Sequence, residues 1–416
     1  MPQSVVVPPT ELKKSSGLKY LKIFLVLLLV VVGYQTVYRA AWNSEKRTDL
    51  LVYRAAGEAI LNGTDIYQAH DGRGWSYVYP PTSAILIAPL TLLPVSLMAF
   101  VWFILEALAI GGATWMSIQL LFPKPKNEDL PWLVAIPIFT LLTFLVSGVQ
   151  RCQESEFMIW LIVASIFYCL KNKPIYAGFA LAAATLIKVF PITLAAYFVI
   201  KRKWSALIAT LMGILLMGLL LPSLVLGWQK NINYLEEWAE LVVGPALHSN
   251  QDRSSASPLY DQLMDSQKPR NQSLESLFLT FNISADKTRY FVVGTGLIMF
   301  GVMFFAAFQV TTKQGELALA AAFMVWHLLI PPISETHYFG VLIFPIVILA
   351  KILLEKTEGR EKARWLWVTL AVFVVNVPFG IKYGEMYRPL CWDSLIIWGV
   401  MILLCIQPNK QPNTQF

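Results

Sequence analysis

Residues 171–203 read KNKPIYAGFALAAATLIKVFPITLAAYFVIKRK, an apolar run with basic residues at both ends. A helix crosses the hydrocarbon core of a bilayer with roughly 20 apolar residues, and this run is longer. Lys188 and Pro191 interrupt it, and an ionisable residue beside a helix breaker at membrane depth is costly unless it faces protein or water. Because cytoplasmic loops are enriched in Lys and Arg, both ends are expected on one side. The sequence therefore predicts a hairpin of two short helices, with its far turn at residues 188–191.

A single crossing by residues 175–200 is the alternative to this hairpin. It would invert every later loop and place Lys356, Arg360, Lys362 and Arg364 on the outer side. That arrangement runs against the usual enrichment of basic residues inside, so the hairpin is preferred.

The composition excludes most other classes of protein. The 416 residues are 56% hydrophobic and 14% charged, whereas soluble globular domains are roughly 45–50% apolar and about 25% charged. An aromatic content of 13% argues against a disordered chain. Four scattered cysteines are too few for a disulfide framework or a metal cage. The net charge of +7 is attributed to inner loops rather than to a nucleic-acid partner.

Apolar runs recur along the whole chain, which predicts an all-α polytopic membrane protein. With the hairpin, they give about twelve crossings, both termini in the cytoplasm of an inner (plasma) membrane, and one domain over residues 1–416. Two long outer loops, 41–80 and 227–289, carry many of the polar residues. The other expected spans are 20–40, 96–122, 131–149, 156–170, 204–226, 290–311, 316–331, 337–354, 363–381 and 391–407.

The first outer loop contains a predicted amphipathic helix along the membrane interface. Apolar residues recur with helical spacing from Leu50 to Ile60, and Asn62-Gly63 is a typical helix end. Thr48 or Asp49 suits the N-cap position. A plain capping role is therefore one interpretation of Asp49.

Several short motifs follow one another in this loop and beyond it. They are Asp49 with Val52-Tyr53, Gly63 and Tyr67; Tyr79-Pro80-Pro81; Pro89-Leu90-x3-Pro94; Ile187-Lys188-Val189-Phe190-Pro191; Asn271-Gln272-Ser273-Leu274; and Pro332-x-Ser334-x2-His337-Tyr338. Together these motifs resemble glycosyltransferase family 87, whose members are polytopic enzymes of the GT-C class, and characterised members use polyprenyl-phosphate mannose as donor. The resemblance covers roughly residues 45–340, and the order of the motifs is more specific than any one of them.

The chain departs from the family pattern at two places. Where members often carry Gly-Gln-x-Asn, this sequence has Gly-Val-Gln-Arg-Cys-Gln at 148–153, so either Gln150 or Gln153 could correspond. Where a Trp usually precedes the late histidine, this sequence has Glu335 or Thr336.

The resemblance implies transfer of a hexose, mannose in the family, from a polyprenyl-phosphate carrier to a lipid-linked or polysaccharide acceptor on the outer face. Such enzymes invert the anomeric centre in one displacement. The acceptor hydroxyl must lose its proton as it attacks, and a carboxylate can accept it. Asp49 matches the family's base, which makes it the predicted catalytic residue.

The leaving lipid phosphate needs cations or preorganised hydrogen-bond donors. The sequence contains no Asp-x-Asp motif and no histidine pair at ligand spacing, so no metal and no cofactor are expected. Lys188 and His337 are the first candidates to bind the phosphate. Lys188 could instead be a lysine that snorkels from a helix end, and His337 an interfacial histidine bonded to a carbonyl. Arg54, Arg151 and Arg388 are further candidates.

Three polar side chains are candidates for binding sugar. Asn271 and Gln272 carry amides able to hydrogen-bond sugar hydroxyls, although they could equally form an ordinary turn. Tyr79 could stack on a substrate or anchor the chain at the interface, where tyrosine is common.

Two other functional classes remain open from the sequence. A transporter or lipid-glycan flippase would place ionisable residues along a path through the membrane. Here the ionisable residues crowd one face, and Glu106 is the chief exception. A polysaccharide ligase or polymerase would use a diphosphate donor and paired arginines, and the large outer loop holds only the scattered Arg253, Arg270 and Arg289.

Overall fold

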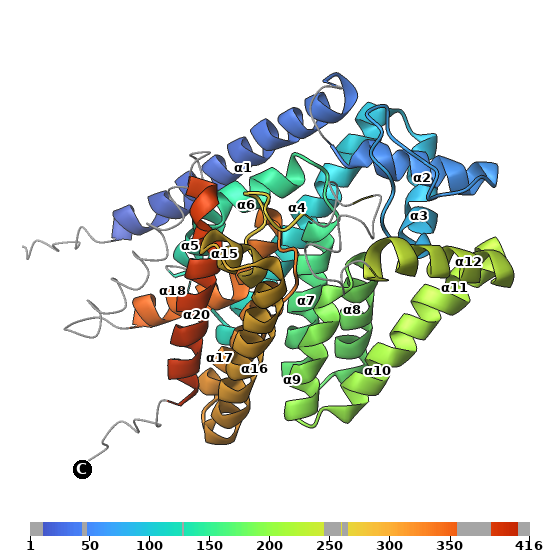
Figure 1. Ribbon diagram of the computed structural model, residues 1–416. Coiled ribbons are helices and arrows are strands. Elements are labelled where there is room, and N and C mark those ends of the chain that lie inside the picture. Colours follow the sequence, from blue (N-terminus) through green and yellow to red (C-terminus); the bar gives the residue numbers. More distant parts are fainter. Residues whose placement is uncertain are drawn as a thin grey trace, which may run out of the picture.

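A computed structural model describes residues 11–43, 48–126, 129–244, 259, 265–355 and 384–406 (Figure 1). Over these ranges the chain is helical, and its only β-type pairings are isolated bridges between His70 and Ser76 and between Asn271 and Glu335. The helices up to the predicted hairpin are α1 (Glu11–Ala41), α2 (Leu50–Asn62), α3 (Pro81–Ile87), η1 (Ala88–Leu92), α4 (Val95–Leu121), α5 (Leu130–Thr140), α6 (Leu142–Val149) and α7 (Ser155–Leu170).

The hairpin and the segment after it form α8 (Pro174–Ile187), η2 (Phe190–Leu194), α9 (Ala195–Ile200), α10 (Trp204–Ile214), η3 (Leu215–Leu220), α11 (Leu221–Leu226), α12 (Trp228–Trp238) and η4 (Ala239–Val243). The later helices are α15 (Leu274–Thr280), α16 (Ala285–Gln309), α17 (Lys313–Leu329), η6 (Thr336–Leu342), α18 (Ile343–Glu355), η8 (Gly384–Tyr387) and α20 (Pro389–Cys405).

Five helical segments in the described part of the chain are long and apolar enough to cross a membrane, and a sixth candidate is the pair α5 and α6, bent by 68°. The bend follows Pro137, which removes a backbone donor from the helix. Most other predicted spans form shorter helices, and 363–381 lies outside the described residues. The expected count of about twelve crossings is therefore not established. The five long segments are Lys19–Ala41, Val95–Leu121, Trp204–Leu226, Ala285–Gln309 and Thr336–Glu355.

The apolar run 174–200 folds as the predicted hairpin. Its two ends meet, because Lys203 Nζ donates a hydrogen bond to Asn172 Oδ1 at 3.4 Å. The helix α10 then runs alongside α8, where Gly178 permits close approach: a Cβ there would lie 2.4 Å from the carbonyl oxygen of Ala206. Both basic ends of the run therefore lie at one end of the molecule. The start of α17 lies at this end as well, because Glu316 there is 3.7 Å from Lys201.

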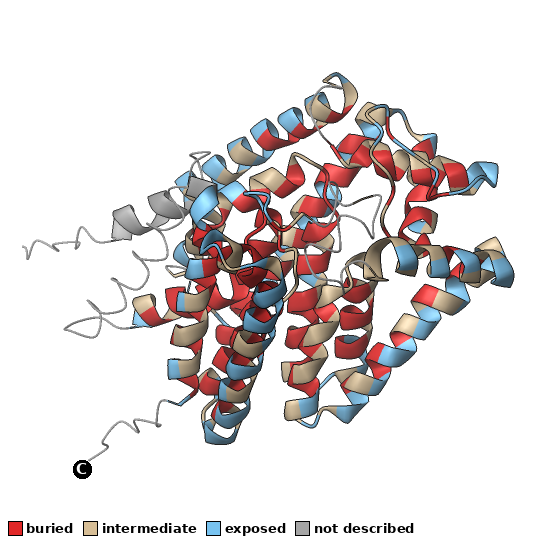
Figure 2. Ribbon diagram, viewed as in Figure 1, coloured by how far each residue is buried: buried red, intermediate tan, exposed pale blue. Residues whose placement is uncertain are grey.

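The apolar residues are divided between a buried core and an exposed surface (Figure 2). The core is densest around α17, α18 and the facing parts of α7 and α8. The faces of α1, α10 and α16 instead expose large apolar side chains such as Val30, Leu211 and Phe305. Exposed apolar helix faces of this kind suit contact with lipid chains, and they agree with an integral membrane protein.

A second, tyrosine-rich core supports the loop that carries Asp49. It is built from α2, the segment 66–79 and the start of α4. The ring of Tyr53 contacts that of Tyr79, Tyr79 contacts Tyr77, and Tyr77 contacts Tyr67, with centroids 5.4–6.0 Å apart. Gly63 ends α2 as expected, in the left-handed conformation with φ 71°. These contacts fix the position of the first turn of α2.

Candidate active site

A cavity of about 340 Å³ lies where α2, the start of α7, the turn after α8 and the segment before η6 converge. Ligand pockets in proteins commonly have volumes of about 300–1,000 Å³. Its polar lining includes the carboxylates of Asp49 and Glu335 and the ammonium of Lys188. The lining residues are Asp49, Val52, Tyr53, Trp75, Ser76, Val78, Tyr79, Gln153, Ile187, Lys188, Val189, Phe190, Trp238, Val242, Val243, Pro331, Pro332, Ile333, Glu335 and Tyr338.

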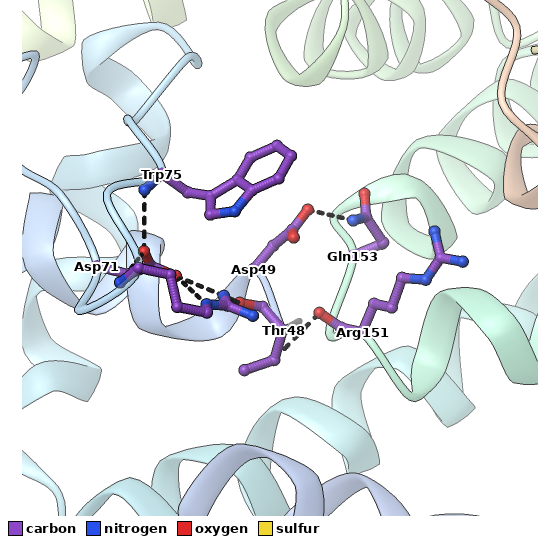
Figure 3. A network of polar contacts seen from close by, with 7 residues as sticks. Thr48, Asp49, Asp71, Trp75, Arg151 and Gln153 are labelled. Carbon is purple, nitrogen blue, oxygen red and sulfur yellow. Dashed lines mark hydrogen bonds and ion pairs between the residues drawn. The ribbon is translucent and has the colours of Figure 1, made fainter. Parts of the chain in front are cut away.

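Asp49 occupies the N-cap position of α2, but its side chain makes no capping hydrogen bond. Its carboxylate instead accepts a hydrogen bond from the side-chain amide of Gln153 (Figure 3). The backbone N–H of Asp49 donates to the carbonyl of Arg151 at 2.8 Å, which joins α2 to the loop before α7. The carboxylate therefore lies at the cavity wall and does not cap the helix.

The structure distinguishes the two candidate glutamines of the motif at 148–153. Gln153 is buried beside Asp49, whereas Gln150 bonds to Gln35 of α1 on the exposed side, with 2.6 Å between the two amides. Gln153 is therefore the glutamine that belongs to the cavity. The sequence pattern alone left this choice open.

Lys188 lies at the far turn of the hairpin, where α8 ends and the backbone becomes extended. Its Nζ donates to the hydroxyl of Tyr338 at 2.7 Å and lies 3.9 Å from the centre of that ring. Phe190 stacks on the ring of Tyr338, with the two centroids 5.3 Å apart. Lys188 lies outside the candidate membrane spans. Burial lowers the pKa of its ammonium to about 8, and the negative charges of Glu335 and Asp49 oppose this lowering. The ammonium thus faces the cavity rather than snorkelling to a helix end.

Glu154 is a buried carboxyl close to this cavity, just before the first residue of α7. It accepts a hydrogen bond from Ser83 at 3.2 Å. Burial raises the pKa of the Glu154 carboxyl to about 8, and the charge of Lys188 opposes this rise. Lys188 and Glu154 therefore titrate in the same pH range.

His337 is fully buried and does not line the cavity. Its Nδ1 lies 3.5 Å from a carboxylate oxygen of Glu335, and its ring meets Tyr338 edge-on with centroids 4.6 Å apart. Both of these neighbours do line the cavity. Of the predicted catalytic and phosphate-binding residues, Asp49 and Lys188 therefore line one cavity, and His337 lies one layer behind it.

None of the three candidate arginines lines the cavity. Arg54 pairs with Glu58 at 2.8 Å and donates to the carbonyl of Leu93. The backbone of Arg151 supports Asp49, but its guanidinium points away from that carboxylate (Figure 3). Arg388 donates to the carbonyls of Gln267 and Pro269, beside a separate surface hollow.

The amides of Asn271 and Gln272 join loops instead of facing the cavity. The Asn271 side chain donates to the carbonyl of Pro332 at 2.8 Å and accepts from the N–H groups of Ser273 and Ser334. Gln272 donates to the carbonyl of Pro269 and accepts from the N–H of Leu390. In this arrangement the two amides hold the segment before η6 and the start of α20, and their contact with sugar stays a prediction.

Tyr79 lines the cavity, and its hydroxyl lies 3.1 Å from that of Tyr53. Trp75, Glu335, Tyr338 and Trp238 line it too, although the sequence did not single them out as site residues. Glu335 and Tyr338 flank the predicted His337, so their positions carried a signal. Nothing in the sequence pattern distinguished Trp75 or Trp238 from other interfacial tryptophans. Within the described ranges, no group of three or more His, Cys, Asp or Glu side chains is placed to hold a metal ion.

Comparison with known proteins identifies the class as a membrane glycosyltransferase. The model of glycosyltransferase family 87 matches residues 77–333, more than half of the chain, and the protein belongs to this family.

The curated relatives are similar along nearly the whole chain. A polyprenol-phosphate-mannose-dependent alpha-(1-2)-phosphatidylinositol mannoside mannosyltransferase of Mycolicibacterium smegmatis is 21% identical, over 90% of this chain and 86% of its own length. A polyprenol-phosphate-mannose-dependent alpha-(1-2)-phosphatidylinositol pentamannoside mannosyltransferase of the same organism is 23% identical, over 93% and 91%.

Among solved structures, ArnT from Cupriavidus metallidurans bound to undecaprenyl phosphate has a TM-score of 0.40 at 10% identity. That match covers 92% of this chain and 76% of ArnT. ArnT in the apo state has a TM-score of 0.42 at 12% identity, covering 94% and 76%.

Proposed function

We propose that this enzyme transfers a hexose, mannose, from a polyprenyl-phosphate carrier to a lipid-linked or polysaccharide acceptor on the outer face of the membrane, with inversion. The two mycolicibacterial relatives are named for a polyprenol-phosphate-mannose donor. The single observation that carries the proposal is that Asp49 and Lys188, from distant parts of the chain, line one cavity.

The proposed reaction is one displacement with Asp49 as general base. The acceptor oxygen attacks the anomeric carbon, its proton passes to the Asp49 carboxylate, and the bond from that carbon to the phosphate oxygen breaks. Gln153 keeps the carboxylate oriented toward the cavity. The products are the glycosylated acceptor, polyprenyl phosphate and a protonated Asp49, which returns its proton to water.

Lys188 is proposed to stabilise the charge that develops on the leaving phosphate. Tyr338 positions its ammonium, His337 lies behind that tyrosine, and Glu335 also lines the cavity. Arg54, Arg151 and Arg388 would act on the phosphate only through rearrangement, so they are not assigned to it. Tyr79 is proposed to contact the sugar from the wall next to Asp49.

The protein is proposed to be a GT-C enzyme of the inner membrane. It would form one domain over residues 1–416, with both termini in the cytoplasm. The end that carries Lys201 and Lys203 would be cytoplasmic, because basic residues concentrate there. The cavity would then open on the outer side, with α2 at the membrane interface.

The test is transfer by the purified full-length protein in lipid nanodiscs with labelled polyprenyl-phosphate mannose. Wild type should release polyprenyl phosphate in step with mannose transfer, and Asp49→Asn should lower the rate by about 100-fold or more, the usual contribution of a general base. Movement of the intact lipid-linked sugar without bond cleavage would identify a flippase. Release of a diphosphate carrier, from a diphosphate donor only, would identify a ligase or polymerase.

A further inference from the structure

The tryptophan Trp75 stands beside Asp49 in the cavity, and no function has yet been given to it. Its indole and the Asp49 carboxylate project the same way, toward Gln153 (Figure 3). Both side chains line the cavity. An aromatic ring next to a carboxylate is a common arrangement for binding sugar, because the apolar face of a pyranose packs on the ring while its hydroxyls reach the acid.

A short rigid loop, residues 70–76, holds Trp75 in place. His70 and Ser76 pair across its base, and Gly74 turns the chain with φ 79°. The buried carboxylate of Asp71 accepts hydrogen bonds from the backbone N–H groups of Arg73 and Trp75, each at 2.9 Å. The N–H of Asp71 donates to the carbonyl of Trp75 at 3.1 Å. The backbone of Trp75 is thus fixed from both sides.

Arg73 connects this loop to the start of α2. Its guanidinium bonds to the Asp71 carboxylate and also donates to the carbonyl of Thr48 at 2.9 Å. Thr48 directly precedes Asp49 in the chain. Asp71 and Arg73 therefore set the distance between the indole and the carboxylate, and such preorganisation lowers the entropy cost of binding.

The position of Trp75 places it on the acceptor side of the reaction. In an in-line displacement the base and the leaving group lie on opposite sides of the anomeric carbon. Lys188, proposed to hold the leaving phosphate, donates to Tyr338, and Phe190 stacks on the ring of that tyrosine. Trp75 is instead tied to Asp49, which must face the attacking hydroxyl. A ring stacked on Trp75 would therefore present its hydroxyl to Asp49.

A role as a membrane anchor explains the position of Trp75 less well. Interfacial tryptophans usually face lipid headgroups, whereas Trp75 is half-buried against the tyrosine-rich core and lines the cavity. We propose that Trp75 is the platform on which the terminal sugar ring of the acceptor stacks, and that the Asp71–Arg73 pair positions it against Asp49. The acceptor is then a sugar-terminated molecule rather than a bare lipid alcohol. This inference rests on the proposed function.

The experiment compares two acceptor probes with purified full-length protein in nanodiscs and polyprenyl-phosphate mannose as donor. Octyl α-mannopyranoside offers a sugar ring, and 1-O-octylglycerol offers hydroxyls on the same tail without a ring. Wild type should prefer the mannoside. Trp75→Ala should raise the KM for the mannoside about tenfold, a loss of about 1.4 kcal/mol, with the KM for the donor and the rate with octylglycerol unchanged.

Further variants separate positioning from general damage. Trp75→Phe keeps an aromatic face and should recover most of the acceptor affinity. Arg73→Ala should raise the KM for the mannoside and lower kcat together, because Arg73 positions both the indole and the carboxylate. The matched control is Trp228→Ala on α12, which is 56% exposed and outside the cavity, and it should change neither constant. Binding of the mannoside to Asp49→Asn, with and without Trp75→Ala, measures affinity where turnover is blocked.

Several outcomes would overturn the inference. One is a rise in the KM for the donor, rather than for the mannoside, in Trp75→Ala. Another is equal use of both acceptors by wild type, which would leave the proposed function intact. If wild type released no polyprenyl phosphate with either acceptor, the proposed function itself would fail, and the role of Trp75 with it.

Discussion

Gln153 donates a hydrogen bond to the carboxylate of Asp49 across a separation of 104 residues. The same loop, through the carbonyl of Arg151, accepts the backbone N–H of Asp49 at 2.8 Å. Asp49, the proposed base, is therefore held at both its backbone and its side chain by the segment before α7. This relationship explains why an aspartate at an N-cap position does not cap its own helix.

The first prediction concerns this hydrogen bond. Gln153→Ala should lower kcat by about 10- to 100-fold, because a hydrogen bond to a charged group contributes about 1.5–3 kcal/mol. The donor KM should change little. Gln150→Ala is the control, since Gln150 bonds to Gln35 on the exposed side. Steady-state transfer rates measure both, and equal losses in the two variants would show that Gln153 has no special role.

The second prediction concerns the phosphate. Lys188→Ala should weaken use of the donor by about 100-fold or more, measured as kcat/KM for polyprenyl-phosphate mannose, because a partly buried cation facing the phosphate is removed. Use of the acceptor should fall less. Lys230→Ala is a suitable control, since Lys230 lies on α12 outside the cavity and donates to the carbonyl of Gly63. Equal losses for donor and acceptor would argue against a phosphate role.

The third prediction is a pH dependence. With a pKa of about 8, Lys188 is charged below pH 8 and becomes neutral above it. The kcat/KM for the donor, which reports groups of the free enzyme, should therefore fall as the pH rises through about 8. Lys188→Arg should move this loss to higher pH, because a guanidinium stays charged.

Glu154 titrates near the same pH, so a matched variant is needed for this profile. Glu154→Gln should leave the alkaline loss of activity in place. If the loss disappears in Glu154→Gln and persists in Lys188→Arg, the titrating group is the carboxyl and the assignment to Lys188 is wrong.

The fourth prediction concerns Asn271. Its side chain makes three hydrogen bonds between loops, so Asn271→Ala should destabilise the protein by about 2–4 kcal/mol. Thermal unfolding in detergent measures this. The KM values for donor and acceptor should change no more than the folded fraction requires. The control is Asn233→Ala, at an exposed position within α12, which should leave the unfolding temperature unchanged. A selective rise in one KM for Asn271→Ala would instead return Asn271 to sugar binding.

The sequence determined the class of this protein and much of its local structure. The excess of apolar residues requires helices whose backbone groups are satisfied internally, and the basic ends of 171–203 favoured a hairpin over a single crossing. The glycine at 63 ended α2 as expected. These features follow from residues close together in the chain, where composition and spacing carry enough information.

Only the tertiary structure decided which polar side chains meet. It placed Asp49, Gln153 and Lys188 on one cavity, set His337 behind Tyr338, and gave Asn271 a role between loops. It also brought Trp75 beside Asp49 through the Asp71–Arg73 pair. The physical reason is that a buried polar group must find a hydrogen-bond partner, and for these residues the partner lies on a segment far away in sequence, where no local pattern can reveal it.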